Sequence, residues 1–385
     1  MTKINLSDMN DPVALLKRLI ACPSLTPEQA GALDVAQDML TAAGFSVQRL
    51  PMGEVDNLWA TDGAPPRLVF AGHIDVVPPG DMAAWQSEPF VATERDGFIY
   101  GRGAADMKSG VAAMLCAAVR IRQKGGAGVA LLLTSDEEGA ALHGTQHVVK
   151  WWQQNGGGII DYGIVGEPTC ESVFGDAIKI GRRGSLTATI TAHGRQTHAA
   201  YPHHGDNPNH RLLPALSEML RRWPPVADSG GYFPPTSLQV VELQSGVGAH
   251  NVIPATAAAV INFRYAPTDD AAVLGQEVES CLRLAGGEWE CEWQHGAVPF
   301  LTAADGELAP ALQESISQCT AQLAKFSTGG GTSDGRFLRA ICRELVEFGP
   351  LNETIHAPNE RVSIEEVKLL TDIYEDTARR LLQKK

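Results

Sequence analysis

The stretch LVFAGHIDVV (68–77) decides the fold, because a short apolar run in it leads directly into the polar segment His73–Asp75. A run of this length that ends in polar residues is typical of a buried strand. Two more such runs, VALLLTSDEE (129–138) and YGIVGEP (162–168), occur later in the chain, and the amphipathic stretch SGVAAMLCAAVRIRQK (109–124) precedes them. Buried strands that alternate with helices predict a largely parallel α/β sheet.

The pattern changes between residues 183 and 292. Here the succession is strand, helix, strand, strand, helix, strand, which predicts a ferredoxin-like β-α-β-β-α-β unit. Its six segments are SLTATITAHG (185–194), NPNHRLLPALSEMLRRW (207–223), TSLQVVELQS (236–245), ATAAAVINFRY (255–265), DDAAVLGQEVESCLRLA (269–285) and EWECEWQ (288–294).

The α/β pattern resumes after this unit. A helix near 307–324 precedes the apolar run in ELVEFGPLNETIH (344–356), and a further helix ends the chain. A chain of 385 residues is also long for a single core. We therefore expect one domain formed by residues 1–182 and 293–385, with a second domain, 183–292, inserted into it.

The composition argues against several kinds of partner and site. A formal net charge of −14, with no block of Lys and Arg among aromatics, opposes nucleic-acid binding. No apolar stretch approaches the ~18 residues of a membrane span, and the amino-terminal segment lacks the apolar core of a signal peptide. We therefore expect a cytoplasmic protein that binds neither nucleic acid nor membrane. Seven scattered cysteines without a C-x-x-C pair predict small buried side chains.

Imidazole and carboxylate side chains follow the apolar runs. Open α/β sheets bind ligands outside the carboxyl ends of their strands, so these residues are expected to meet at one edge. Asp106 precedes a helix whose expected N-cap is Ser109, which brings its carboxylate to the same edge. The candidate metal ligands are His73, Asp106, Glu138, Glu167 and His356.

Each of these residues alone has a simpler interpretation, since a lone Asp or Glu after a strand is usually a turn or cap residue and a lone His is usually a core residue. Together they are harder to explain without a metal. Carboxylates crowded at one edge repel one another unless a cation neutralises them, and two imidazoles with three carboxylates suit a pair of zinc ions. Cobalt and manganese accept similar ligands, so the sequence leaves the metal open.

Local spacing suggests two further roles at this edge. His73 and Asp75 lie on the same face if the backbone is extended, so Asp75 is expected to hold the imidazole in one tautomer. Glu137 and Glu138 are adjacent, so their side chains point apart. One of them can bind metal while the other accepts a proton from water, and the spacing does not decide which.

The motifs form a set that extends nearly from end to end of the chain: GHIDVVPPGD (72–81), YGRGAADMKSG (100–110), TSDEEG (134–139), VGEP (165–168), GRRGSL (181–186), HAAYPH (198–203), FPPTS (233–237), NVIP (251–254), TGGGTSDGRF (328–337) and EFGPLNETIH (347–356). In this set the sequence resembles the succinyl-diaminopimelate desuccinylases, within the wider group of co-catalytic zinc aminoacylases and carboxypeptidases. GRRGSL, FPPTS and TGGGTSDGRF are the more particular motifs. The resemblance implies a zinc-peptidase-like catalytic domain, an inserted dimerisation or lid domain, and hydrolysis of N-succinyl-LL-2,6-diaminopimelate.

The resemblance also implies individual roles. It implies that Asp106 bridges two zinc ions, and that the peptide bond after it is cis. His73 and Glu167 would bind one ion, and Glu138 and His356 the other. Glu137 would be the general base, and His198 would reach the site of the other subunit of a homodimer to stabilise the oxyanion. The implied substrate contacts are Arg182, Ser185, Tyr201, Asn251, Arg264 and Thr332.

Two positions depart from the family pattern. His250 stands where a second Asn is expected before NVIP, and Thr197 stands where Gly is frequent. The substrate of the resemblance carries three carboxylates, which guanidinium groups can hold, although the default interpretation of Arg264 is a surface residue on a strand.

Several alternatives remain open. His143 and His147 have a helical metal-binding spacing but no H-E-x-x-H motif, and the TGGGTSDG loop lacks the phosphate-binding pattern. The same zinc site serves deacylases and exopeptidases of other N-acyl amino acids. A metal-stabilised binding protein without catalysis is a third possibility, although a retained Glu137 argues against it.

Overall fold

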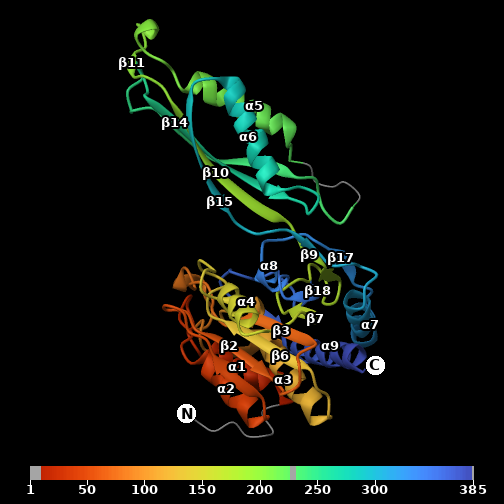
Figure 1. Cartoon of the computed structure of the whole chain (residues 1–385). Coiled ribbons are helices and arrows are strands. Elements are labelled where there is room, and N and C mark those ends of the chain that lie inside the picture. Colours follow the sequence, from red (N-terminus) through yellow and green to blue (C-terminus); the bar gives the residue numbers. More distant parts are fainter. Residues whose placement is uncertain (1–9, 226–230, 384–385) are drawn as a thin grey trace. The chain divides into compact units, whose positions relative to one another are not determined.

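A computed structural model describes residues 10–225 and 231–383 of the chain (Figure 1). The chain divides into two compact units. One consists of Arg182–Leu301 with Thr328–Thr332, and the other of the remaining described residues. None of the described helices has the length and apolar character to cross a membrane.

A mixed sheet forms the centre of the first unit. Among the described residues it contains eight strands, in the order β1-β2-β6-β3-β7-β18-β8-β17. The pairs β6–β3, β3–β7, β7–β18 and β8–β17 are parallel. The strands are β1 (Ser46–Arg49), β2 (Asn57–Thr61), β6 (Val129–Thr134), β3 (Leu68–His73), β7 (Ile160–Val165), β18 (Cys342–Glu347), β8 (Ala177–Lys179) and β17 (Lys325–Ser327).

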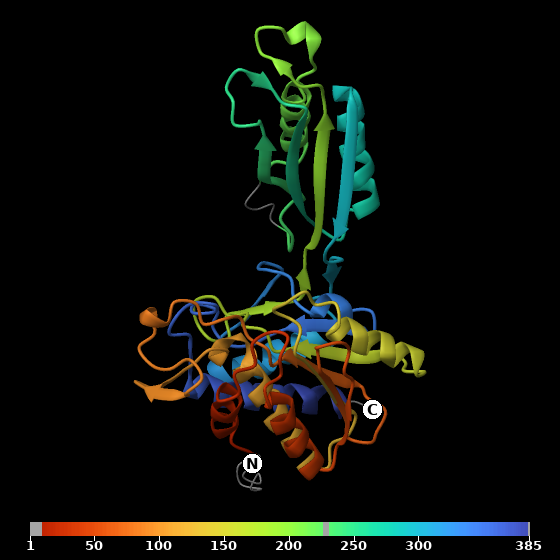
Figure 2. The same cartoon turned by 90° about the vertical axis from the view of Figure 1, so that its left-hand side faces the viewer.

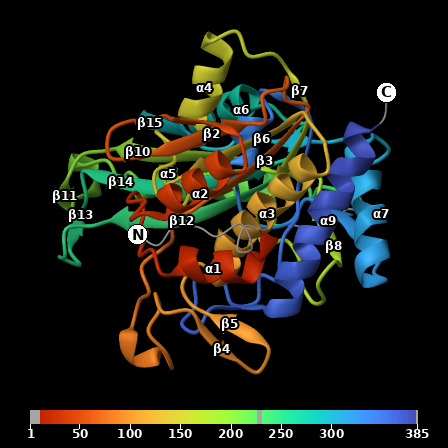
Figure 3. The same ribbon diagram turned by 90° about the horizontal axis from the view of Figure 1, so that it is seen from below.

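Helices cover both faces of this sheet. Figure 3 shows α1, α3 and α9 on one face and α4 on the other. Because it lies between the sheet and its neighbours α1 and α9, α3 is buried almost all around rather than amphipathic. The helices are α1 (Pro12–Ile20), α2 (Ala32–Ala42), α3 (Ser109–Gln123), α4 (Thr145–Gln154), α7 (Leu308–Thr320), α8 (Gly335–Leu338) and α9 (Ile364–Leu382).

A small antiparallel sheet, β19-β5-β4, completes the first unit. Its strands are β4 (Thr93–Arg95), β5 (Phe98–Tyr100) and β19 (Arg361–Ser363). Arg361 pairs with Tyr100, so the segment after β5 lies beside the segment before β19.

The second unit is an antiparallel sheet in the order β12-β14-β10-β15, with two helices on one face (Figures 1 and 2). Alternate residues of β10, from Leu186 to Ala192, are buried in the core formed with these helices. The elements are β10 (Gly184–His193), α5 (Asn209–Arg222), β12 (Ser237–Ser245), β14 (Thr256–Tyr265), α6 (Ala271–Ala285) and β15 (Glu288–His295).

The predicted fold class is confirmed: a mostly parallel central sheet accompanies a separate β-α-β-β-α-β unit. One local prediction was wrong. Ser109 is the first residue of α3 and not its N-cap, and the preceding residue, Lys108, makes no side-chain cap. The backbone at Asp106 and Met107 departs from helical angles, so the turn before α3 differs from an ordinary capped start.

Candidate metal centre

Three neighbouring parallel strands bring their carboxyl ends to one edge of the sheet. His73, the last residue of β3, pairs with Thr134, the last residue of β6, and Ala71 pairs with Val165 at the end of β7. Glu137 and Glu138 follow β6 after a short turn, and Glu167 follows β7. The predicted convergence of side chains at this edge therefore has a direct cause in the strand register.

Close packing brings the start of α3 to the same edge. A Cβ atom added to Gly110, in the first turn of α3, would lie 2.3 Å from the carbonyl oxygen of Gly166, just beyond β7. A side chain at position 110 would therefore push the helix away from the strand end. Asp106, which precedes α3, consequently lies near Glu167. The Asp106–Met107 peptide bond is cis.

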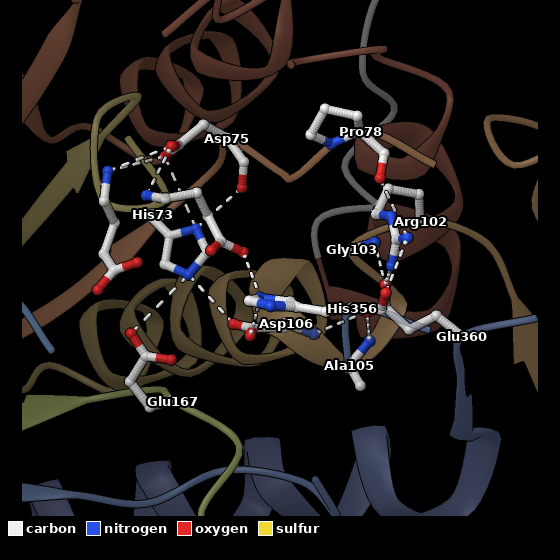
Figure 4. A network of polar contacts seen from close by, with 12 residues as sticks. His73, Asp75, Pro78, Arg102, Gly103, Ala105, Asp106, Glu167, His356 and Glu360 are labelled. Atoms are coloured by element: carbon white, nitrogen blue, oxygen red, sulfur yellow. Dashed lines mark hydrogen bonds and ion pairs between the residues drawn. The ribbon is translucent and has the colours of Figure 1, made fainter. Parts of the chain in front are cut away.

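The carboxylate of Asp106 lies between two imidazoles (Figure 4). Its Oδ1 is 3.2 Å from Nε2 of His73, and its Oδ2 is 3.2 Å from Nε2 of His356. Each oxygen therefore faces a different ring, as a carboxylate that bridges two cations does.

A second carboxylate accompanies each imidazole. Oε1 of Glu167 lies 3.8 Å from Nε2 of His73, and Oε1 of Glu138 lies 3.0 Å from Nε2 of His356. We call the pair His73 and Glu167 the inner half-site and the pair His356 and Glu138 the outer half-site. The side chain of His73 is 1% exposed, whereas that of His356 is 49% exposed.

The carboxylates of the two half-sites bring negative charge together, and a bound cation would neutralise it. Burial and the nearby charge of Asp106 raise the pKa of Glu167 well above its usual value. Its buried Oε1 also has no hydrogen-bond partner among the described residues. Although burial favours the neutral acid, hydrogen bonds from His356 and His73 hold the pKa of Asp106 well below its usual value. Imidazole and carboxylate ligands around a buried oxygen that lacks a hydrogen-bond partner fit a divalent metal.

Asp75 acts differently from the sequence expectation in one detail. Nδ1 of His73 lies 2.9 Å from the backbone carbonyl oxygen of Asp75, and 3.7 Å from its carboxylate. The carboxylate instead accepts hydrogen bonds from the backbone N–H groups of Glu137 and Glu138. Asp75 thus orients the imidazole through its main chain and fixes the turn after β6 through its side chain.

Glu137 lies beside the half-sites in a strongly negative environment. Burial and neighbouring negative charges, first that of Asp334, raise its pKa to about 8, against the opposing effect of His73. Asp334 is itself buried, and burial raises its pKa to about 6. Asp334 lies in the motif TGGGTSDGRF (328–337), but no role was predicted for it from the sequence.

The remaining candidate residues lie in the second unit. The backbone N–H of Ala200 donates to Nδ1 of His198, and the side chain of Asn251 lies 3.2 Å from Nε2 of the same ring. Because an N–H group can only donate, Nδ1 is an acceptor, and a neutral His198 carries its proton on Nε2. Tyr201 is 5.8 Å from this ring, centroid to centroid.

The predicted substrate contacts of the second unit fall into separate places. Ser185 and Arg264 are directly opposite each other on β10 and β14. Arg182 is buried and donates to the carbonyl oxygen of Gly329, while Thr332 is half-buried. His250 is exposed, and Thr197 pairs with Ile253 in a two-residue ladder.

Two alternative metal ligands are not on one helix. His147 lies in α4, but His143 precedes the helix and is exposed, so their four-residue spacing is not a helical one. Sequence reasoning also overlooked two buried charged residues next to the half-sites, Arg102 and Glu360. Arg102 lies in the motif YGRGAADMKSG (100–110), whereas Glu360 lies outside the family motifs.

Comparison with known proteins agrees with this description. A succinyl-diaminopimelate desuccinylase of Bordetella petrii is 48% identical over 376 residues, which cover 96% of this chain and 97% of that protein. One of Coxiella burnetii is 44% identical, with 97% and 100% covered. The resemblance inferred from the motifs is thereby confirmed.

Solved structures share the fold at lower identity. Aminopeptidase PepT of Bacillus cereus is 19% identical, with a TM-score of 0.78 over 99% of this chain and 100% of that chain. A dinuclear metal-binding peptidase of Bacillus subtilis is 14% identical, with a TM-score of 0.72 over the same shares. The model of Peptidase family M20/M25/M40 matches residues 69–380, and the chain belongs to this family.

Proposed function

We propose that this chain is an amide hydrolase that cleaves N-succinyl-LL-2,6-diaminopimelate to succinate and LL-2,6-diaminopimelate, a step of lysine and diaminopimelate biosynthesis. The observation that carries the reaction class is the carboxylate of Asp106, whose two oxygens face two imidazoles, each accompanied by a glutamate. The substrate follows from the relatives, which are 44–48% identical over nearly their full length and named for this reaction.

The proposed cofactor is a pair of zinc ions, for which cobalt or manganese can substitute. The inner half-site would hold one ion and the outer half-site the other, with Asp106 shared between them. When bound, such ions supply Lewis acidity to the amide carbonyl and lower the pKa of water.

Glu137 is the proposed general base. It is not one of the four half-site residues, although its carboxylate lies within 4.8 Å of ligand atoms of His73 and Glu167. Asp75 accepts its backbone N–H and so fixes the turn that carries it. Its carboxylate takes a proton from the attacking water as the water oxygen bonds to the amide carbon. As the carbon–nitrogen bond breaks, Glu137 returns this proton to the leaving amine nitrogen.

His198 is the proposed stabiliser of the tetrahedral oxyanion. Its Nδ1 accepts the N–H of Ala200, so Nε2 of the neutral ring is a donor. A hydrogen-bond donor stabilises the negative charge that develops on the amide oxygen in the tetrahedral intermediate. Because the resemblance places this residue in the site of another subunit, the proposal includes a homodimer.

An exposed sheet edge supports the homodimer. β12 is an edge strand of the second unit, and Val241 and Leu243 on it are 61% and 55% exposed. Unpaired apolar edge strands favour pairing with another chain, here a second copy. We also propose a cytoplasmic location, which agrees with seven cysteines that are all free.

The substrate is anionic although the chain has a net charge of −14, so local cations have to hold its three carboxylates. Arg182 and Arg264 are the proposed guanidinium partners, because the planar guanidinium fork matches a carboxylate. The proposed neutral contacts are Ser185, Tyr201, Asn251 and Thr332.

The proposed substrate can be tested with a panel of amides under identical conditions. We expect kcat/KM for N-succinyl-LL-diaminopimelate to exceed that for N-acetylornithine or a dipeptide by at least about tenfold, since those lack the full set of carboxylates. Product amine release measures each rate. A higher kcat/KM for either of the other substrates would assign the chain to another deacylase or an exopeptidase.

The role of Glu137 can be tested by Glu137→Gln, which keeps the shape of the side chain and removes the proton acceptor. We expect kcat to fall by about 10²–10⁴-fold with two metal ions still bound. Metal content and turnover measured on one preparation separate these effects. Glu88→Gln, at an exposed position, is the matched control. Wild-type turnover in Glu137→Gln would exclude the proposed proton transfer. If neither the wild type nor any variant turned over substrate, the chain would instead be a metal-stabilised binding protein without catalysis.

Metal binding should release protons. Without metal, burial disfavours the charged ring of His73, but Asp106 and nearby carboxylates raise its pKa well above the usual value. Hydrogen bonds to Asp106 and Glu138 raise the pKa of His356 to about 10. Both rings, and Glu167, therefore hold protons near neutral pH that a metal must displace. Affinity should rise from pH 6 to pH 8, and calorimetry in buffers of different ionisation enthalpy should give different heats. Equal heats would contradict this assignment.

The action of His198 across subunits can be tested by mixing two inactive variants, His198→Ala and Glu137→Gln. A mixed dimer would contain one site with an intact base and an intact partner histidine. Random exchange should restore about a quarter of wild-type activity, because half the dimers are mixed and each has one intact site. No recovery, with exchange verified by mass spectrometry, would show that His198 acts within its own subunit or not at all.

A further inference from the structure

Arg102 and Glu360 form an ion pair that the proposed site does not use. Nη1 of Arg102 lies 2.7 Å from Oε2 of Glu360, and both residues are 1% exposed. The pairing of β5 with β19 brings them together, since Arg102 follows β5 and Glu360 precedes β19. Figure 4 shows this pair beside the half-sites.

Glu360 holds the segment that carries Asp106. Its Oε2 accepts the backbone N–H of Gly103, and its Oε1 accepts those of Ala105 and Asp106, each at 2.9 Å. One buried carboxylate thus accepts hydrogen bonds from three backbone N–H groups within four residues. The position of the Asp106 backbone, and hence of its carboxylate, depends on Glu360.

Arg102 holds two other segments. Its Nη2 donates to the carbonyl oxygens of Pro78 at 3.3 Å and His356 at 3.5 Å, and its Nη1 donates to that of Ala357 at 3.4 Å. Pro78 lies in the loop that follows β3, and His356 belongs to the outer half-site. The backbone angle φ of His356 is +59°, in the left-handed region, which needs support from its surroundings.

Stability alone does not account for such a pair. A buried ion pair contributes little net stability, because the loss of hydration offsets the attraction between its charges. What distinguishes this pair is the number of main-chain groups that it fixes, most of them at or next to the proposed ligands Asp106 and His356. Groups that support metal ligands in this way influence metal affinity.

We propose that Arg102 and Glu360 are positioning residues of the metal centre with unequal roles, an inference that rests on the proposed metal ligands. Glu360 sets the position of Asp106, which both half-sites share. Arg102 sets the backbone of His356, which only the outer half-site uses. Loss of Glu360 therefore weakens the binding of both ions, and loss of the Arg102 guanidinium weakens mainly the binding of the ion in the outer half-site.

The experiment compares Glu360→Gln and Arg102→Lys with wild type. Lys keeps the charge and one contact with Glu360 but cannot reach the carbonyl groups of three residues. We expect Glu360→Gln to weaken both dissociation constants by about 10–100-fold, and Arg102→Lys to weaken one of them by this factor. Chelator competition gives the two constants, and the absorption spectrum of the cobalt-loaded protein reports ligand geometry.

Asp376→Asn is the matched control for a purely structural effect. Asp376 accepts a hydrogen bond from Arg380 within α9 and one from Ser315, which joins α9 to α7. Its loss should lower the melting temperature without changing either metal constant or the cobalt spectrum. This control separates destabilisation from positioning.

Each outcome decides between the alternatives. If both variants melt earlier but keep wild-type constants and spectra, the pair is structural and the inference is wrong. If Arg102→Lys weakened the binding of both ions equally, the proposal that Arg102 and Glu360 have unequal roles would be contradicted. If Glu360→Gln does not fold, Arg102→Lys decides alone, because it keeps the three backbone contacts of Glu360. A wild-type protein that binds no pair of ions would overturn the proposed metal centre instead.

Discussion

The negative charge gathered at one edge of the central sheet is the constraint on which the rest of the first unit depends. Parallel pairing of β3, β6 and β7 brings Glu137, Glu138 and Glu167 together whether or not their charges are compensated. Imidazole rings and main-chain N–H groups are among the groups that compensate this charge. The carboxylate of Asp106 faces two imidazole rings, and its backbone N–H donates a hydrogen bond to Glu360. A buried α3 and a Gly110 without a side chain make this approach possible.

The second unit has a different physical character. Its antiparallel sheet buries one face against α5 and α6, and the segment after β10 carries His198. The backbone N–H of Ala200 donates to Nδ1 of His198, so the neutral ring is in the tautomer whose Nε2 can donate. The candidate metal ligands therefore lie in the first unit, and the proposed oxyanion donor His198 lies in the second. An anionic amide substrate needs both sets of groups.

The sequence predicted the fold class well because strands such as Leu68–His73 and Val129–Thr134 are apolar throughout and short. It also predicted which residues lie at the strand ends, since that follows from strand order. It did not predict the Asp75 contacts, because spacing cannot distinguish a main-chain carbonyl from a carboxylate as the partner of His73. Arg102, Asp334 and Glu360 were missed for a related reason. Charged residues in loops are usually solvated, and only tertiary packing makes these three buried.

The unequal exposure of the two imidazoles has a kinetic consequence. The side chain of His73 is buried, whereas that of His356 is 49% exposed. Ligand exchange requires an entering molecule to reach the metal, so ions at the two half-sites would be replaced at different rates. Brief dialysis against a second metal would then give a mixed-metal species with the original ion retained beside His73. Such a species would allow each ion to be observed separately by spectroscopy within one protein.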